Sequence, residues 1–146
     1  MLFSKTCEYG LQAMIFLAVE GKKVGLTKIS EKQSLPSYYL SKILQNLVKA
    51  KILESAKGPT GGFWLSKPSD SIRLAHIVDA IDGMDTLDQC GLGLKKCDSN
   101  SPCAVHDQFK PNREAIIDIF YKTTLQNIVE RYKKGEIVIT LGDENN

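Results

Sequence analysis

Residues 51–83 read KILESAKGPTGGFWLSKPSDSIRLAHIVDAIDG and carry the most specific pattern in the chain. Two short segments, 52–56 and 63–65, flank a turn rich in Gly and Pro at 57–62, which predicts a β-hairpin. Apolar residues then recur at helical spacing from Leu74 to Asp82, and Gly83 is typical of a helix end. The stretch therefore predicts a hairpin followed by a short helix.

Three helices are predicted before this hairpin. They cover about Ser4–Glu20, Lys28–Gln33 with Thr27 as its cap, and a segment to about Ala50 with Pro36 in its first turn. The third helix has an apolar and a polar face. We expect it to bury Leu40, Ile43, Leu44 and Leu47 and to expose Tyr38, Ser41, Lys42 and Gln45. Three helices and a hairpin are the order of a winged helix-turn-helix.

The C-terminal part is predicted to form one long helix, Asn112–Lys134, followed by a possible short strand and an acidic tail over 137–146. Its apolar residues have near-heptad spacing, which favours packing against a symmetry mate. They are Ile116, Ile119, Phe120, Thr123, Ile128 and Val129. The expected fold is mostly α-helical with a small β-hairpin wing and a long C-terminal dimerisation helix. We divide it into a winged domain (1–84), a cysteine-rich sensor loop (85–111) and a dimerisation helix with a tail (112–146).

Composition places the chain among ordinary globular proteins. Of its 146 residues, 42% are hydrophobic and 25% are charged, and the net charge is +2. The positive charge lies in residues 1–84, with 11 Lys and Arg against seven Asp and Glu, as expected for a domain that contacts DNA. No apolar run reaches membrane-spanning length, and the N-terminus lacks a secretion signal, so we expect a cytoplasmic protein without a membrane partner.

Cys90, Cys97, Cys103 and His106 form the pattern C-x6-C-x5-C-x2-H in one turn-rich stretch. Reduced thiols and an imidazole can bind a soft metal or an iron–sulfur cluster, and this ligand set favours 2Fe–2S over 4Fe–4S. Three alternatives stay open at this point. The same ligands suit a structural zinc site, the thiols could form a cofactor-free oxidation switch, and His106 could be a packing residue.

The hairpin GPTGGFWL, the following I-x-L-x-x-I-V-x-A-I-D-G pattern and the opening helix CEYGLQAMIFLA resemble the Rrf2 family of bacterial winged-helix transcription regulators. The resemblance covers nearly the whole chain. It implies a homodimer that binds two-fold-related double-stranded DNA, with the long helices at the interface. Cluster-binding members have three cysteines in this loop, and some have a histidine two residues after the third, as His106 stands here. In the nitric-oxide-sensing branch an acidic residue of the partner subunit completes the site, which makes Glu8 an alternative fourth ligand.

The resemblance also implies which residues contact DNA. It places Tyr38, Ser41 and Lys42 toward the major groove and Lys57 toward the minor groove, where many members have Arg. From their chemistry, Lys42 and Gln45 can donate to base edges, while Ser37 and Thr60 can bind phosphates. The alternative is that these residues form only a solvated helix face and an ordinary hairpin. A family member without a cofactor that is switched by a protein partner is a further alternative. An enzyme with a nucleophilic cysteine is not expected, because no C-x-x-C or recognisable Cys–His–acid pattern is present.

Overall fold

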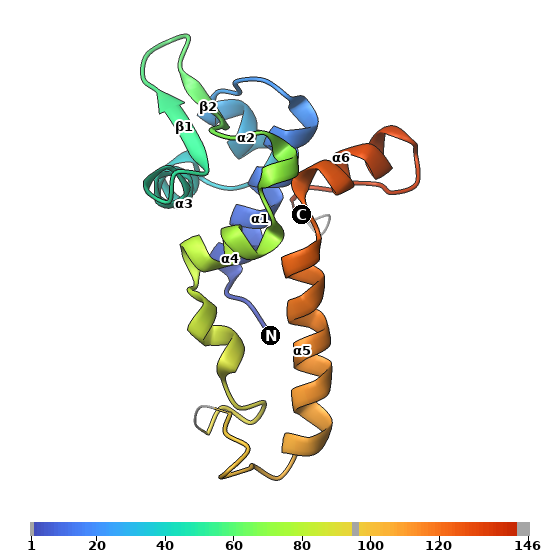
Figure 1. The fold of residues 1–146 in the computed structure, drawn as a ribbon. Coiled ribbons are helices and arrows are strands. Elements are labelled where there is room, and N and C mark those ends of the chain that lie inside the picture. The colour runs from blue at the N-terminus through green and yellow to red at the C-terminus, as the bar shows by residue number, and fades with distance from the viewer. Residues whose placement is uncertain (1, 95–96, 143–146) are drawn as a thin grey trace.

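The computed structural model describes residues 2–94 and 97–142, and it confirms a mostly helical fold with one hairpin (Figure 1). In chain order the elements are α1 (Lys5–Glu20), α2 (Leu26–Gln33), α3 (Ser37–Lys49), β1 (Leu53–Ala56), β2 (Gly62–Leu65), the 3-10 helix η1 (Ser69–Ser71), α4 (Leu74–Ile81), the 3-10 helix η2 (Met84–Asp88), α5 (His106–Lys122) and α6 (Leu125–Lys133). The hairpin and the cysteine loop lie at opposite ends of the molecule, with α1 and α4 between them.

The main core lies between α1, α3, the hairpin and α6. All four residues of the predicted stripe on α3 are at most 1% exposed, and Leu40, Leu44 and Leu47 share one core cluster with α1 residues such as Met14 and Leu17. Two predicted helix starts were wrong by a small margin. Thr27 lies inside α2, whose N-cap is Gly25, and Pro36 is the N-cap of α3 rather than a residue of its first turn. Both shifts are local and leave the polar face of α3 unchanged.

The hairpin is antiparallel, with Leu53 opposite Leu65 and Ala56 opposite Gly62. Its turn requires glycine, because a Cβ on Gly61 would lie 2.2 Å from the carbonyl oxygen of Ala56. Phe63 anchors the second strand: it is buried and exchanges backbone hydrogen bonds with Val24, in the segment before α2. The wing is therefore fixed to the helical core at its base, while the tip, 57–60, is exposed.

The predicted helix Asn112–Lys134 is two helices in the structure. α5 starts earlier, at His106, and contains Pro111; near this proline the Asn112 side chain donates to the carbonyl of Gln108. The chain becomes extended at Thr123, and Thr124 caps α6 by accepting from the amide of Asn127. The break returns α6 to the winged domain, where Leu125 is 0% and Val129 4% exposed.

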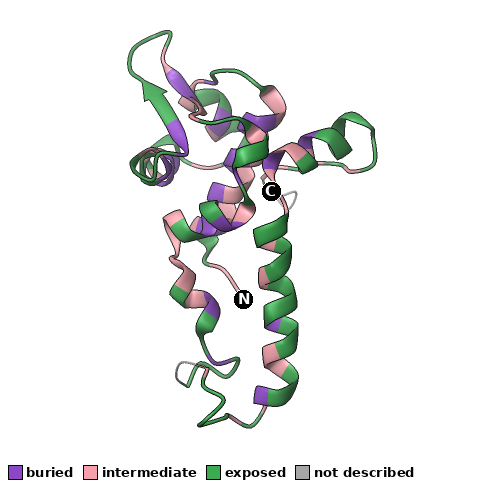
Figure 2. Cartoon of the chain, viewed as in Figure 1, coloured by how far each residue is buried: buried purple, intermediate pink, exposed green. Residues whose placement is uncertain are grey.

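The break also changes the role of the apolar residues predicted for a dimer interface. Phe120 packs on Phe3, with ring centroids 4.8 Å apart, and Val129 belongs to the main core. Ile116 and Ile119 are exposed, and α5 presents a largely exposed outer face (Figure 2). Over the described tail residues, 137–142, the predicted strand is absent. None of the helices in the described ranges combines the length and the apolar character needed to cross a membrane.

Candidate DNA-binding surface and cysteine loop

The polar face of α3 is the first candidate surface. Tyr38 is 75% exposed, and the Nζ atom of Lys42 lies 4.4 Å from the centre of its ring, so the two side chains form a cation–π pair. Ser37 and Gln45 are also exposed, whereas Ser41 is half-buried. Since the opposite stripe is buried in the core, this face has a fixed orientation and offers one ammonium group, one amide and three hydroxyl groups to a ligand.

The tip of the hairpin is the second candidate surface. Lys57 and Thr60 are both exposed, and the amide of Gly61 donates to the carbonyl of Gly58 at 3.0 Å, which closes the turn between them. Gln45 of α3 and Lys57 of the tip line the same groove, together with residues of α2. One predicted residue of the helix, Gln45, and one of the wing, Lys57, therefore line the same groove.

The start of α2 is also part of this groove, although the sequence analysis named no DNA contact there. Gly25, Thr27 and Lys28 line the groove, and α2 has no side-chain cap. The N-terminal end of α2, where a helix has unpaired backbone N–H groups and the positive end of its dipole, therefore borders the groove. The signal in the sequence was the absence of a capping side chain at Gly25.

The cysteine loop brings two of the four predicted ligands together. The Sγ atom of Cys97 and the Nδ1 atom of His106 are 3.3 Å apart, and His106 is 7% exposed. The amide of Cys97 donates to the carbonyl of Asp88 at 2.7 Å, so the middle of the loop is held to the end of η2. The amide of His106, the first residue of α5, donates to the carbonyl of Cys103 at 3.1 Å.

The other candidate ligands are two cysteines of the same loop and one glutamate on another helix. Cys90 is buried and Cys103 half-buried. Glu8 lies on α1, where its carboxylate is 3.2 Å from the ammonium group of Lys5. All four cysteines are described, and none forms a disulfide. Within the described residues, no group of three or more His, Cys, Asp and Glu side chains is placed to hold a metal ion.

The part of the loop around Cys90 packs on the inner face of α5. The backbone of Gly91 lies so close to the ring of Phe109 that a Cβ there would come within 2.7 Å of it. One turn further along α5, Arg113 is 6% exposed and donates from Nη1 to the carbonyl of Gln89 at 3.2 Å. Sequence reasoning missed Arg113, although its position four residues after Phe109 and four before Ile117 marks the inward face of the helix.

Comparison with known proteins identifies this arrangement. Residues 3–131 match the model of a family described as Rrf2, an iron-dependent transcriptional regulator. This chain is a member of the Rrf2 family. The resemblance that the wing and the following helix indicated is confirmed.

Three relatives show how far the similarity to Rrf2 proteins extends. An HTH-type transcriptional regulator of Aquifex aeolicus is 31% identical, over 92% of this chain and 95% of that protein. The HTH-type transcriptional regulator IscR of Erwinia tasmaniensis is 27% identical, over 94% of this chain and 82% of that protein. The crystal structure of Staphylococcus aureus CymR superposes with a TM-score of 0.69 at 27% identity, over 87% and 97% of the two chains. These relatives are transcription regulators and not enzymes.

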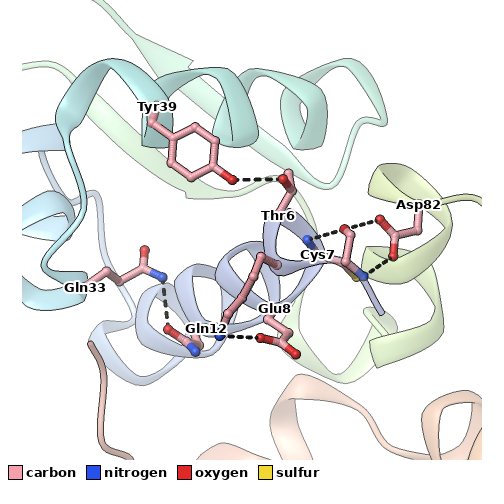
Figure 3. A network of polar contacts seen from close by, with 9 residues as sticks. Thr6, Cys7, Glu8, Gln12, Gln33, Tyr39 and Asp82 are labelled. Atoms are coloured by element: carbon pink, nitrogen blue, oxygen red, sulfur yellow. Dashed lines mark hydrogen bonds and ion pairs between the residues drawn. The ribbon is translucent and has the colours of Figure 1, made fainter. Parts of the chain in front are cut away.

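In this Rrf2 chain, polar contacts at the start of α1 connect the end of α4 with α3 (Figure 3). Asp82, at the end of α4, accepts hydrogen bonds from the amide and hydroxyl of Ser4, the N-cap of α1. Two residues further on, the Thr6 hydroxyl is 2.9 Å from the Tyr39 hydroxyl, on α3. These contacts join the end of α4, which leads through η2 to Cys90, with α1 and α3.

Cys7 lies within this network and differs from the loop cysteines. It is 0% exposed, and burial, followed by the nearby Asp82 carboxylate, raises the pKa of its thiol to about 12. A thiol that stays protonated is a poor nucleophile and a poor metal ligand. Cys7 is thus a core residue of the winged domain.

Proposed function

We propose that this Rrf2 regulator is a homodimer that binds a two-fold-related operator and changes its DNA affinity with the state of the cysteine loop. The observation that carries the proposal is one groove lined by Gln45 of α3, by the uncapped start of α2 and by Lys57 of the wing tip. This combination can contact bases and phosphates together. The proposed DNA contacts are Ser37, Tyr38, Ser41, Lys42, Gln45, Lys57 and Thr60.

The outer face of α5 supports the homodimer. Ile116 and Ile119, one turn apart on the 17-residue helix α5, are 40% and 57% exposed. An exposed apolar strip on a helix that stands at the edge of the fold is typical of a protein–protein contact. A second copy of the same helix would cover it in a symmetric arrangement, in which each protomer contributes the same patch.

We further propose that Cys90, Cys97, Cys103 and His106 bind an iron–sulfur cluster, with Glu8 of the partner subunit as the alternative fourth ligand. The donor set fits this group, because three thiols and one imidazole occur in one loop and Cys97 already lies beside His106. This donor set favours a 2Fe–2S cluster. When bound, the cluster would supply sensitivity to iron, oxidants or nitric oxide. The protein would hold it with the loop and orient His106 through the start of α5.

One observation also favours a second candidate, a cofactor-free thiol switch. Cys97 is half-exposed and shares a hydrogen bond with the imidazole of His106, an arrangement that can activate a thiol toward oxidants. A zinc site with the same ligands would hold the loop in one conformation instead. Iron, sulfide and zinc analysis of protein purified without air separates these alternatives from a cluster.

Selection from random duplexes tests the DNA-binding part of the proposal. The expected result is enrichment of two related half-sites whose centres are about 10 base pairs, or a multiple, apart. Lys42→Ala should lose this enrichment, whereas Lys122→Ala, at an exposed position on α5, should retain it. Enrichment of a single unrepeated site would contradict a symmetric dimer, and unchanged selection by Lys42→Ala would remove α3 from the DNA surface.

A further inference from the structure

Arg113 is a buried cation without an acidic partner in the described part of the chain. It is 6% exposed, and none of the ion pairs formed between described residues includes it. Its Nη1 atom donates to a carbonyl, and its Nε atom is buried with no hydrogen-bond partner among the described residues. Burying a charge without a counter-charge is costly, so this arrangement indicates that an anion is missing from its surroundings.

The surroundings of Arg113 show where that anion would lie. The carbonyl that accepts from Arg113 belongs to Gln89, the residue before Cys90. The guanidinium carbon is 5.9 Å from the centre of the Phe109 ring, on which Gly91 packs. Arg113 and Phe109 therefore hold the chain on both sides of Cys90 against α5. His106, the partner of Cys97, is at the start of the same helix.

We propose that Arg113 supplies the counter-charge for the thiolate-bound cluster and thereby slows its loss from the loop. The inference rests on the proposed cluster. The three negative charges of the thiolates exceed the positive charge of a 2Fe–2S core, so the assembled site is anionic. The guanidinium keeps its charge at all physiological pH values and can donate several hydrogen bonds from a fixed plane. The charge of Arg113, which no described residue balances in the empty protein, is balanced when the loop holds the cluster.

The test compares wild type with Arg113→Met, which keeps much of the side-chain length and removes the charge. After reconstitution with iron and sulfide, cluster loss to an iron chelator is followed by visible absorbance without air. We expect loss from Arg113→Met to be about 10 to 100 times faster, the range typical for removal of a group that supports metal ligands. Arg113→Lys should fall between the two. Lys122→Met is the control, since Lys122 is an exposed cation on the same helix that pairs with Asp118, and it should leave the rate within about twofold.

The thermal midpoint of the cluster-free protein separates a counter-charge from a packing residue. Without the cluster, Arg113→Met should melt at the wild-type temperature or above it, because the substitution removes an uncompensated buried charge. Equal chelator rates in Arg113→Met and wild type would overturn the inference while leaving the cluster proposal intact. A lower melting temperature of empty Arg113→Met, or a weakened dimer, would assign Arg113 to packing or to a partner's carboxylate and also overturn it. A wild-type protein that takes up no iron and sulfide would overturn both proposals.

Discussion

Cys7 and Cys97 show the difference between the two halves of this molecule. Cys7 is 0% exposed, lies beside α4 and has a thiol pKa of about 12. Cys97 is half-exposed and pairs with the imidazole of His106. The same residue type is thus unreactive in the winged domain and available for chemistry in the loop. The environment of each thiol, rather than its presence, decides which one can sense a signal.

The difference extends to the segments that carry these thiols. In the winged domain, residues from α1, α3, the hairpin and α6 share one core. Among the described residues of segment 89–105, Cys90 alone is buried. Most of the described part of that segment is exposed, which is typical of segments that can change conformation without unfolding of the rest of a domain. A stable DNA-binding domain and an adaptable loop are the two components that a ligand-controlled regulator needs.

Truncation of a core leucine should give the largest difference between the two halves. Leu44→Ala should lower the free energy of unfolding by about 2–5 kcal/mol, because Leu44 is 0% exposed and the substitution leaves a cavity. Leu94→Ala, at a loop position that is 72% exposed, should change it by less than about 0.5 kcal/mol. Denaturant unfolding followed by circular dichroism measures both. Equal losses would show that the loop contributes to the same cooperative core.

Alkylation of the thiols should separate Cys7 from the loop cysteines. Native cluster-free protein treated with iodoacetamide at pH 8 should be modified at Cys97 and Cys103 before Cys7, as read by peptide mass spectrometry.

The folded state retains the Cys7 proton up to a pKa of about 12, against 9.0 for an ordinary thiol. The contribution of the neutral Cys7 thiol to the free energy of unfolding is therefore fully present below pH 9 and is lost as pH rises from 9 toward 12. A Cys7→Ala variant should lose less stability over this alkaline interval; early modification of Cys7 would contradict the assignment.

A smaller effect is expected at the tip of the wing. Lys57→Ala should weaken DNA binding and reduce the slope of log affinity against log salt by about one unit per protomer, as for one lost phosphate or groove contact. Lys122→Ala should leave the slope unchanged, since that residue lies on α5 and pairs with Asp118. Fluorescence anisotropy over a series of salt concentrations measures both slopes. An unaltered slope for Lys57→Ala would exclude the wing tip from the DNA surface.

Much of the winged domain could be predicted from the sequence because its signals are local. The apolar stripe of α3, the glycines of the hairpin turn and the end of α4 each depend on a few adjacent residues. The break at Thr123 and Thr124 was missed because the apolar periodicity continues across it. What separates α5 from α6 is tertiary: the carbonyl of Thr123 accepts from the amide of Leu74, and the amide of Leu125 donates to the carbonyl of Ile72.

The sequence indicated the cysteines and the histidine of the candidate site, but it did not indicate which residues of α5 pack beside them. The spacing of Cys90, Cys97, Cys103 and His106 marked the loop, and the structure places Cys97 next to His106. Arg113 was not found, because an arginine in a long helix is usually solvated. Only the packing of Gln89 and Gly91 on α5 shows that this arginine is buried beside the loop.

The most direct test of the account compares DNA affinity in the loaded and empty states. The duplex selected above would be titrated with wild type before and after cluster reconstitution without air, and with Cys97→Ser treated in the same way. We expect matched iron and sulfide and a changed affinity in wild type. Cys97→Ser should take up no cluster and should bind DNA with one affinity under both treatments. A loaded wild type that binds the duplex as tightly as the empty protein would contradict control of DNA binding by the cysteine loop.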